Sequence, residues 1–204
     1  MSEHLTSVAA ALAARGFEPH VFATAAEAKT YLLGEIEKNA PVAVGGSMTI
    51  KDLGLADTLR EQGHEVFWHW EAAPSDRPGV LLKALHADYY LASANAITES
   101  GVIVQIDGTG NRVGAMIAGP KEVIVVAGAN KLVDGNIAQA IARIKTVACP
   151  QNARRLGLNT PCGLQGKCDA AHCEKGMCNV TSIIERPVGG HKITIVLVDE
   201  EAGY

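Results

Sequence analysis

Four cysteines stand close together in the stretch TPCGLQGKCDAAHCEKGMCNV: Cys162, Cys168, Cys173 and Cys178. Five, four and four residues separate them in turn, and glycines among them let the chain turn tightly around an ion. Converging thiolates bind zinc tetrahedrally or hold an iron-sulfur cluster. The spacing matches neither the paired zinc knuckles nor the ferredoxin pattern. The clustering therefore predicts a metal centre without fixing the metal; we favour iron-sulfur and keep zinc as the alternative.

Two other interpretations of these cysteines stay open. His172 can replace one thiolate as a ligand, because imidazole also binds zinc. The four thiols can instead be independent small buried side chains or a redox pair. A stable disulfide framework is disfavoured in a reducing compartment. Cys149, beside Pro150, is expected to pack in the core and is left out of the site.

A second group of residues could bind an anion. In VAVGGSMTIKDLGL a buried strand ends, and Gly45 and Gly46 allow a ligand to approach the backbone. Ser47 and Thr49 follow as caps of a helix whose first amides favour anions. An ordinary strand-to-helix turn with a capping serine would have the same sequence. This turn is a candidate ligand site that needs support from elsewhere in the chain.

That support comes from the stretch between ITESG and GTGNR. Glu99, followed by Ser100 and Gly101, is the candidate catalytic residue, since a carboxylate at a strand end can act as nucleophile, base or ligand. Asn111 and Arg112 form a donor pair suited to a carboxylate or phosphate. The alternative is a solvated turn glutamate and a surface arginine worth less than ~1 kcal/mol. Because α/β sheets bind ligands beyond their strand ends, we expect these residues to share one crevice with the glycine turn.

The surrounding elements must position these residues. Short continuous apolar runs, such as PVAV, GVIVQI and KEVIVV, alternate with helical patterns along most of the chain. Such runs are typical of strands buried on both faces, which predicts an α/β layered fold with a largely parallel sheet. The segment DGNIAQAIARIKTVACPQNARRLG is expected to be a long helix interrupted at Pro150. Residues 149–190 break the rhythm and form a Cys-rich insert within a single domain spanning 1–204.

Composition limits the classes of partner. The chain has 204 residues, is 48% hydrophobic and carries a formal charge of -4 with no basic block, so nucleic acid is not expected as a partner. The first residues lack the basic start of a signal peptide, and no apolar run is long enough for a membrane span. We expect a cytoplasmic protein without membrane contact.

Several stretches together resemble one known family. These are AVGGSMTIKDLGLADTLREQGHEV, ADYYLASANAITESGVIVQIDGTGNRVGAMIAGPKEVIVVAGANKLV, NARRLGLNTPCGLQGKC and CNVTSIIERP. In order and content they are similar to the lactate utilization (LUD) domain family, which includes the LutC/YkgG proteins. The resemblance covers nearly the whole chain.

The resemblance implies a fold and a setting. It implies a three-layer α/β/α sandwich with a mostly parallel sheet, like the NagB/RpiA/CoA-transferase superfamily. It also implies a role in oxidation of L-lactate beside iron-sulfur partner proteins. From the crevice residues we expect a small organic anion as ligand, and a second copy of the chain is a further candidate partner. In the branch that ends in a similar Cys-rich segment the third cysteine lies closer to the second, which leaves Cys173 the least secure ligand.

The same superfamily implies a second interpretation. Class I CoA-transferases carry a catalytic glutamate in a Glu-x-Gly element, which the sequence Glu99-Ser100-Gly101 resembles. The protein would then be a CoA-transferase-like or sugar-phosphate-isomerase-like enzyme that requires Glu99. Alternatively, it is a non-catalytic interaction module with a structural zinc.

Overall fold

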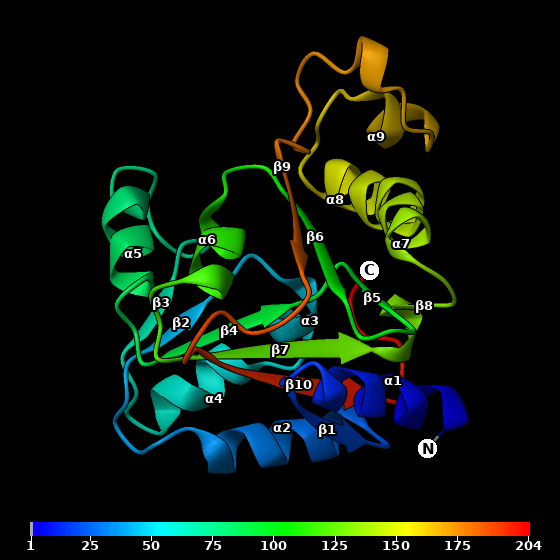
Figure 1. The fold of residues 1–204 in the computed structure, drawn as a ribbon. Coiled ribbons are helices and arrows are strands. Elements are labelled where there is room, and N and C mark those ends of the chain that lie inside the picture. Colours follow the sequence, from blue (N-terminus) through cyan, green and yellow to red (C-terminus); the bar gives the residue numbers. More distant parts are fainter. Residues whose placement is uncertain (1) are drawn as a thin grey trace.

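A six-stranded parallel sheet forms the centre of the molecule, here a computed structural model that describes residues 2–204 (Figure 1). Every neighbouring pair of strands in it is parallel. Its edge-to-edge order is β1 (Glu18–Phe22), β10 (Lys192–Val198), β7 (Glu122–Gly128), β4 (Tyr89–Ser93), β2 (Val42–Val44) and β3 (Val66–Trp68).

Helices cover both faces of this sheet. Alternate side chains of β7 point to opposite sides, so Ile124 and Val126 join one core cluster while Val123 and Val125 join the other. The first face is covered by α2 (Ala25–Glu35), α3 (Met48–Asp52) and α4 (Leu55–Glu61). The opposite face is covered by α1 (Glu3–Ala14), α5 (Arg77–Ala84) and α6 (Asn111–Ile117). The predicted three-layer α/β/α arrangement is confirmed.

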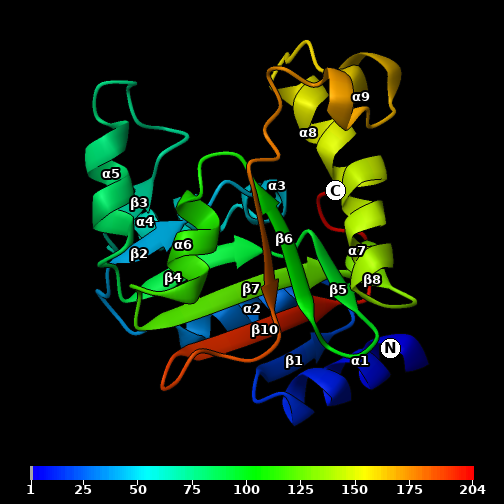
Figure 2. The same ribbon diagram turned by 45° about the horizontal axis from the view of Figure 1, so that its top comes forward.

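A smaller four-stranded sheet rises from the second face, as Figure 2 shows. Its order is β8 (Leu132–Val133), β5 (Ala96–Thr98), β6 (Ile103–Asp107) and β9 (Val180–Ile184). β6 is antiparallel to both β5 and β9, whereas β5 and β8 are parallel. The short turn η1 (Ala129–Lys131) connects β7 of the main sheet to β8. The second sheet therefore faces the carboxyl ends of the central strands.

One nearly continuous helix packs on the second sheet through a third core cluster. It consists of α7 (Ile137–Arg143), a π-helical turn η2 (Ile144–Ala148) and α8 (Cys149–Arg155). Pro150 has no N–H to donate to the preceding turn, and the wide turn lies directly before it. The expected interruption at Pro150 is thus a local change of helical pitch, after which the helix continues to Arg155.

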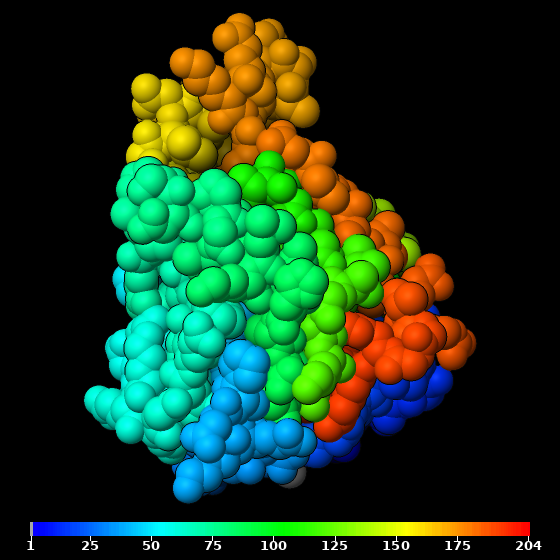
Figure 3. Space-filling view, turned by 90° about the vertical axis from the view of Figure 1, so that its left-hand side faces the viewer, coloured from blue at the N-terminus to red at the C-terminus, as the bar shows by residue number. Residues whose placement is uncertain are grey.

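The Cys-rich segment is only partly irregular. After α8 it contains α9 (Pro161–Gln165) and the turn η3 (Ala170–His172), and then β9, which pairs with β6. In the space-filling view α9 and the loop after it form a lobe projecting from the body of the molecule (Figure 3). Within residues 149–190, helix α8 and strand β9 therefore belong to the body of the domain, and the part between them forms the lobe. No helix within residues 2–204 is long and apolar enough to cross a membrane.

Candidate functional site

A cavity of about 680 Å³ lies where the central strands end, between the main sheet and the helix formed by α7, η2 and α8. Segments that follow β2, β3, β4 and β7 all contribute to its lining, as do the loop between β6 and α6 and the residue Tyr204. Ligands of open α/β sheets bind beyond the carboxyl ends of the strands. The cavity occupies that position.

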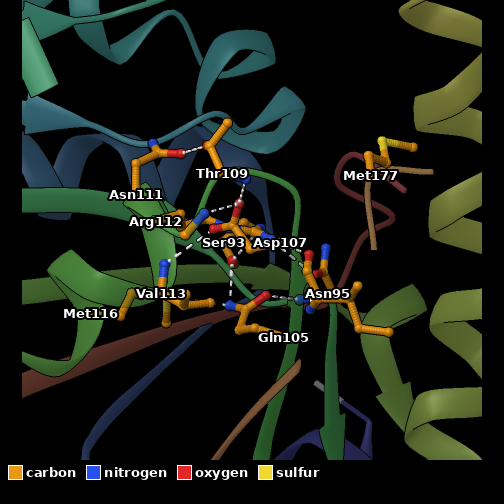
Figure 4. Close-up of polar contacts among 12 residues, drawn as sticks. Ser93, Asn95, Gln105, Asp107, Thr109, Asn111, Arg112, Val113, Met116 and Met177 are labelled. Atoms are coloured by element: carbon orange, nitrogen blue, oxygen red, sulfur yellow. Dashed lines mark hydrogen bonds and ion pairs between the residues drawn. The ribbon is translucent and has the colours of Figure 1, made fainter. Parts of the chain in front are cut away.

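Asp107, the last residue of β6, organises the loop at one side of the cavity (Figure 4). Its Oδ1 accepts hydrogen bonds from the amides of Thr109 at 3.2 Å and Gly110 at 3.3 Å. Its Oδ2 accepts from the amide of Val113 at 3.2 Å and lies 3.8 Å from Nε of Arg112. One carboxylate thus fixes the turn and the first residues of α6.

Arg112 is buried beside this carboxylate, and its guanidinium is directed at acceptors of the chain itself. It donates to Oδ1 of Asn95 at 2.9 Å, to the carbonyl of Ile106 at 3.0 Å and to the carbonyl of Ser93 at 3.4 Å. Burial lowers the pKa of Arg112, and Asp107 opposes that shift. Arg112 lines the cavity, but its donors mainly hold the second sheet against the end of β4 (Figure 4).

Lys131 lies buried where β7 has ended, and it also lines the cavity. Its Nζ donates to Oγ1 of Thr49 and to Oγ of Ser93, both at 2.7 Å. Burial lowers the pKa of Lys131 to about 7, and the charges of Arg143 and Arg112 act in the same direction. Desolvation penalises the charged form of an amine, so this lysine is neutral in a large fraction of molecules at neutral pH.

The outer part of the cavity carries further cations. Lys51, Arg77 and Arg155 line it, and the guanidinium carbon of Arg155 lies 4.4 Å from the centre of the Trp70 ring. Burial, followed by the charge of Arg77, lowers the pKa of His69, which favours a neutral imidazole here. With Arg112 and Lys131, five basic residues line the cavity against one acidic residue, Asp107. On a chain of net charge -4 this is a local concentration of positive charge.

The predicted glycine turn lies at this cavity. A Cβ on Gly45 would lie 2.9 Å from the Tyr90 hydroxyl, and one on Gly46 would lie 3.1 Å from Nε1 of Trp70, so both positions require close approach. Gly46 and Ser47 line the cavity, and Ser47 caps α3 by accepting from the amide of Ile50 at 3.2 Å. Of the predicted ligand residues, the structure brings four together at the cavity wall: Gly46, Ser47, Asn111 and Arg112.

The model of the LUD domain family matches residues 5–198 of this chain. The chain belongs to the LUD domain family. Its fold is similar to the crystal structure of a DUF162 family protein from Deinococcus radiodurans, with a TM-score of 0.57, 14% sequence identity, and coverage of 97% of this chain and 99% of that one. No functionally curated protein matches it. These comparisons show the family and the fold.

Glu99 lies away from the cavity of this LUD domain. It occupies the exposed turn between β5 and β6, next to Ser100, whose carbonyl accepts a hydrogen bond from Nε of Arg15 at 2.5 Å. Gly101 has φ +76°, and a Cβ there would lie 2.7 Å from the backbone of Ala11 in α1. The expectation that this turn shares a crevice with the glycine turn is therefore wrong. Because β5 and β6 pair antiparallel, the turn between them lies against α1 and not at the cavity.

The predicted metal ligands lie in and beside the projecting lobe of the LUD domain. Cys162 is buried, Cys173 and Cys178 are half-buried, and Cys168 is exposed. The closest thiols are those of Cys178 and Cys149, whose Sγ atoms are 3.4 Å apart. Cys149 is a core residue as expected, yet it also lines the cavity and contacts a predicted ligand.

The arrangement of these thiols does not form a metal site as it stands. Within residues 2–204 no three side chains of histidine, cysteine, aspartate or glutamate are placed to hold one ion. His172 is engaged with Asp169, its Nδ1 lying 2.8 Å from Oδ2. A four-thiolate site would need the predicted ligands to come closer together than they lie here.

Sequence reasoning missed Lys131, Asp107 and Ser93. Ser93 and Asp107 end the apolar strands YYLAS and IVQID, and Lys131 lies three residues after the end of β7 in VIVVAGANK, so strand ends were the available signal. Sequence alone does not show that Lys131 is 3% exposed and lies against Ser93 and Thr49. Thr49 was predicted as a helix cap; its hydroxyl contacts the buried amine instead.

Proposed function

We propose that this LUD-domain protein binds a small organic anion in the strand-end cavity and takes part in oxidation of an organic acid, L-lactate. The observation that carries the proposal is the positive charge of the cavity: Arg112 is paired with the one acidic lining residue, Asp107, and Lys51, Arg77 and Arg155 add charge that no lining carboxylate balances. Because Arg112 is occupied by Asp107 and backbone carbonyls, the outer cations remain to hold a carboxylate. Arg155 already donates to Oδ1 of Asn152 and to the Tyr204 hydroxyl, which hold its guanidinium at the cavity. The organic acid itself is proposed from family membership.

Arg155→Gln is expected to weaken anion binding about tenfold, because one charge-assisted contact at the cavity mouth is lost. Isothermal titration with L-lactate and pyruvate, at low and at moderate salt, measures it. Glu99→Gln, on the exposed turn outside the cavity, is the matched control and should bind like the unmodified protein. Equal affinities for Arg155→Gln and the unmodified protein would remove the cavity as the anion site.

A second candidate is supported by the size of the cavity. At about 680 Å³ it exceeds what a three-carbon acid fills and is in the range of drug-sized ligands. We therefore keep a CoA-transferase-like or sugar-phosphate-isomerase-like enzyme as the alternative. The position of Glu99 outside the cavity opposes its use as nucleophile there. Titration with ribose 5-phosphate and acetyl-CoA tests this reading, since binding of either at micromolar concentration, with lactate and pyruvate inert, would favour it.

We also propose, from the clustering of thiols, that the projecting lobe binds a metal, an iron-sulfur cluster or zinc. A cluster would suit an electron-transfer role beside iron-sulfur proteins of lactate oxidation, whereas zinc alone would suit a structural module. Protein purified without oxygen is expected to carry iron and sulfide, and Cys178→Ser to lose both. Elemental analysis and the visible spectrum decide this. Zinc would support the structural reading, and a metal-free, colourless protein would contradict both.

A further inference from the structure

The amine of Lys131 has hydroxyl groups, and not a carboxylate, as its partners. The ion pairs formed within residues 2–204 do not include it, whereas the buried Asp107 and Arg112 pair with each other, and Asp52 acts on Lys131 only as a charge without a contact. A buried lysine without a carboxylate partner is costly when charged. Lys131 is therefore placed poorly for a structural ion pair, which raises the question of what its amine does in the cavity wall.

The hydrogen bonds around Nζ match a neutral amine. The Thr49 hydroxyl donates to the carbonyl of Ala202 at 3.0 Å and the Ser93 hydroxyl to that of Ala94 at 3.3 Å, so both oxygens accept from Lys131. A neutral amine has two N–H groups, and these two acceptors satisfy both. Its lone pair then remains free. An ammonium has a third N–H, for which residues 2–204 provide no further acceptor.

The chain also shields this amine from bulk water on one side. A Cβ placed on Gly203 would lie 2.5 Å from Oγ1 of Thr49 and 3.3 Å from Nζ, so the backbone near Gly203 covers the amine closely. The remaining approach is from the cavity, which Lys131 and Ser93 both line. A group bound in the cavity can therefore meet the amine from this side.

We propose that Lys131 is a nucleophilic amine that forms an imine with the carbonyl carbon of a 2-oxo acid bound in the cavity. The lone pair of Nζ forms the C–N bond, the two amine protons leave with the carbonyl oxygen, and one water is released. The Ser93 and Thr49 hydroxyls, both within hydrogen-bond distance, can hold these protons in transit. This inference rests on the proposed anion binding, because the outer cations would hold the carboxylate.

The test is chemical trapping with pyruvate and cyanoborohydride, in which hydride adds to the imine carbon and leaves a stable secondary amine. Peptide mapping by mass spectrometry should place the adduct on Lys131, formed on the order of a hundredfold faster at pH 7 than on an exposed lysine, since far more of the buried amine is neutral. Lys131→Met should form none there. Lys121→Arg, which replaces an exposed lysine paired with Asp88, should react like the unmodified protein.

Pyruvate affinity is measured on the same samples by calorimetry, so that the two proposals can fail separately. Pyruvate that binds but leaves no adduct on Lys131 would overturn the imine and leave anion binding in place. Absence of both binding and adduct would overturn both proposals. Adducts spread equally over exposed lysines would also overturn the imine. Because mapping is done on the unmodified protein, the result does not depend on the folding of any variant.

Discussion

Asp107→Ala is expected to lower the free energy of unfolding by about 3 kcal/mol, because it leaves the buried Arg112 guanidinium without its counter-charge. Asp107 and Arg112 are both almost fully buried, at 8% and 9% exposure, so water cannot replace the lost carboxylate. The substitution also leaves the amides of Thr109, Gly110 and Val113 without their acceptor. Urea unfolding followed by circular dichroism measures the loss.

The control is Asp57→Ala, which removes an aspartate that pairs with Arg60 but is 79% exposed. Its cost should stay below ~1 kcal/mol, as for other surface ion pairs. A double substitution, Asp107→Ala with Arg112→Met, should cost less than the sum of the single substitutions, since removing both charges leaves neither unpaired. Additive losses, or a loss below ~1 kcal/mol for Asp107→Ala alone, would show that the pair does not hold the loop.

The layers of this fold could be predicted because their signal is local. The run VIVVAG is apolar at every position, which is expected of a strand covered on both faces, and with Glu122 before it this run forms the central strand β7. The close approach at Gly45 and Gly46 was likewise predictable from a double glycine between a strand and a helix. Such features depend on a few consecutive residues, so the sequence carries them directly.

The arrangement of the site depends on contacts between distant residues, which the sequence does not display. Lys131 meets Thr49 and Ser93, positions 82 and 38 residues away. Glu99 looked equivalent to other strand-end residues, but the antiparallel pairing of β5 with β6 turns it away from the cavity. The proximity of Cys149 to Cys178 likewise arises because α8 packs beside the start of β9.

The buried amine should make stability depend on pH in a particular direction. In the unfolded chain the pKa of Lys131 is near 10.5, and in the folded protein burial lowers it to about 7. Between these values the unfolded chain binds a proton that the folded protein does not, so the free energy of unfolding rises with pH. The penalty is fully present below pH 7 and is gone above pH 10.5. This loss of stability is expected where a buried amine is kept neutral for a reaction, because functional sites often reduce the stability of the fold.

Lys131→Met removes this titration, so we expect the stability of the unmodified protein relative to Lys131→Met to rise by about 2 kcal/mol from pH 7 to pH 9. Urea unfolding of both proteins at each pH measures the difference, and the comparison cancels other titrating groups. Lys121→Met is the matched control, because Lys121 is exposed and its pKa is raised by Asp88, so it stays protonated in both states over this range. A difference that does not change between pH 7 and pH 9 would mean that Lys131 keeps its proton in the folded protein, and with it the lone pair needed to attack a carbonyl would be absent at neutral pH.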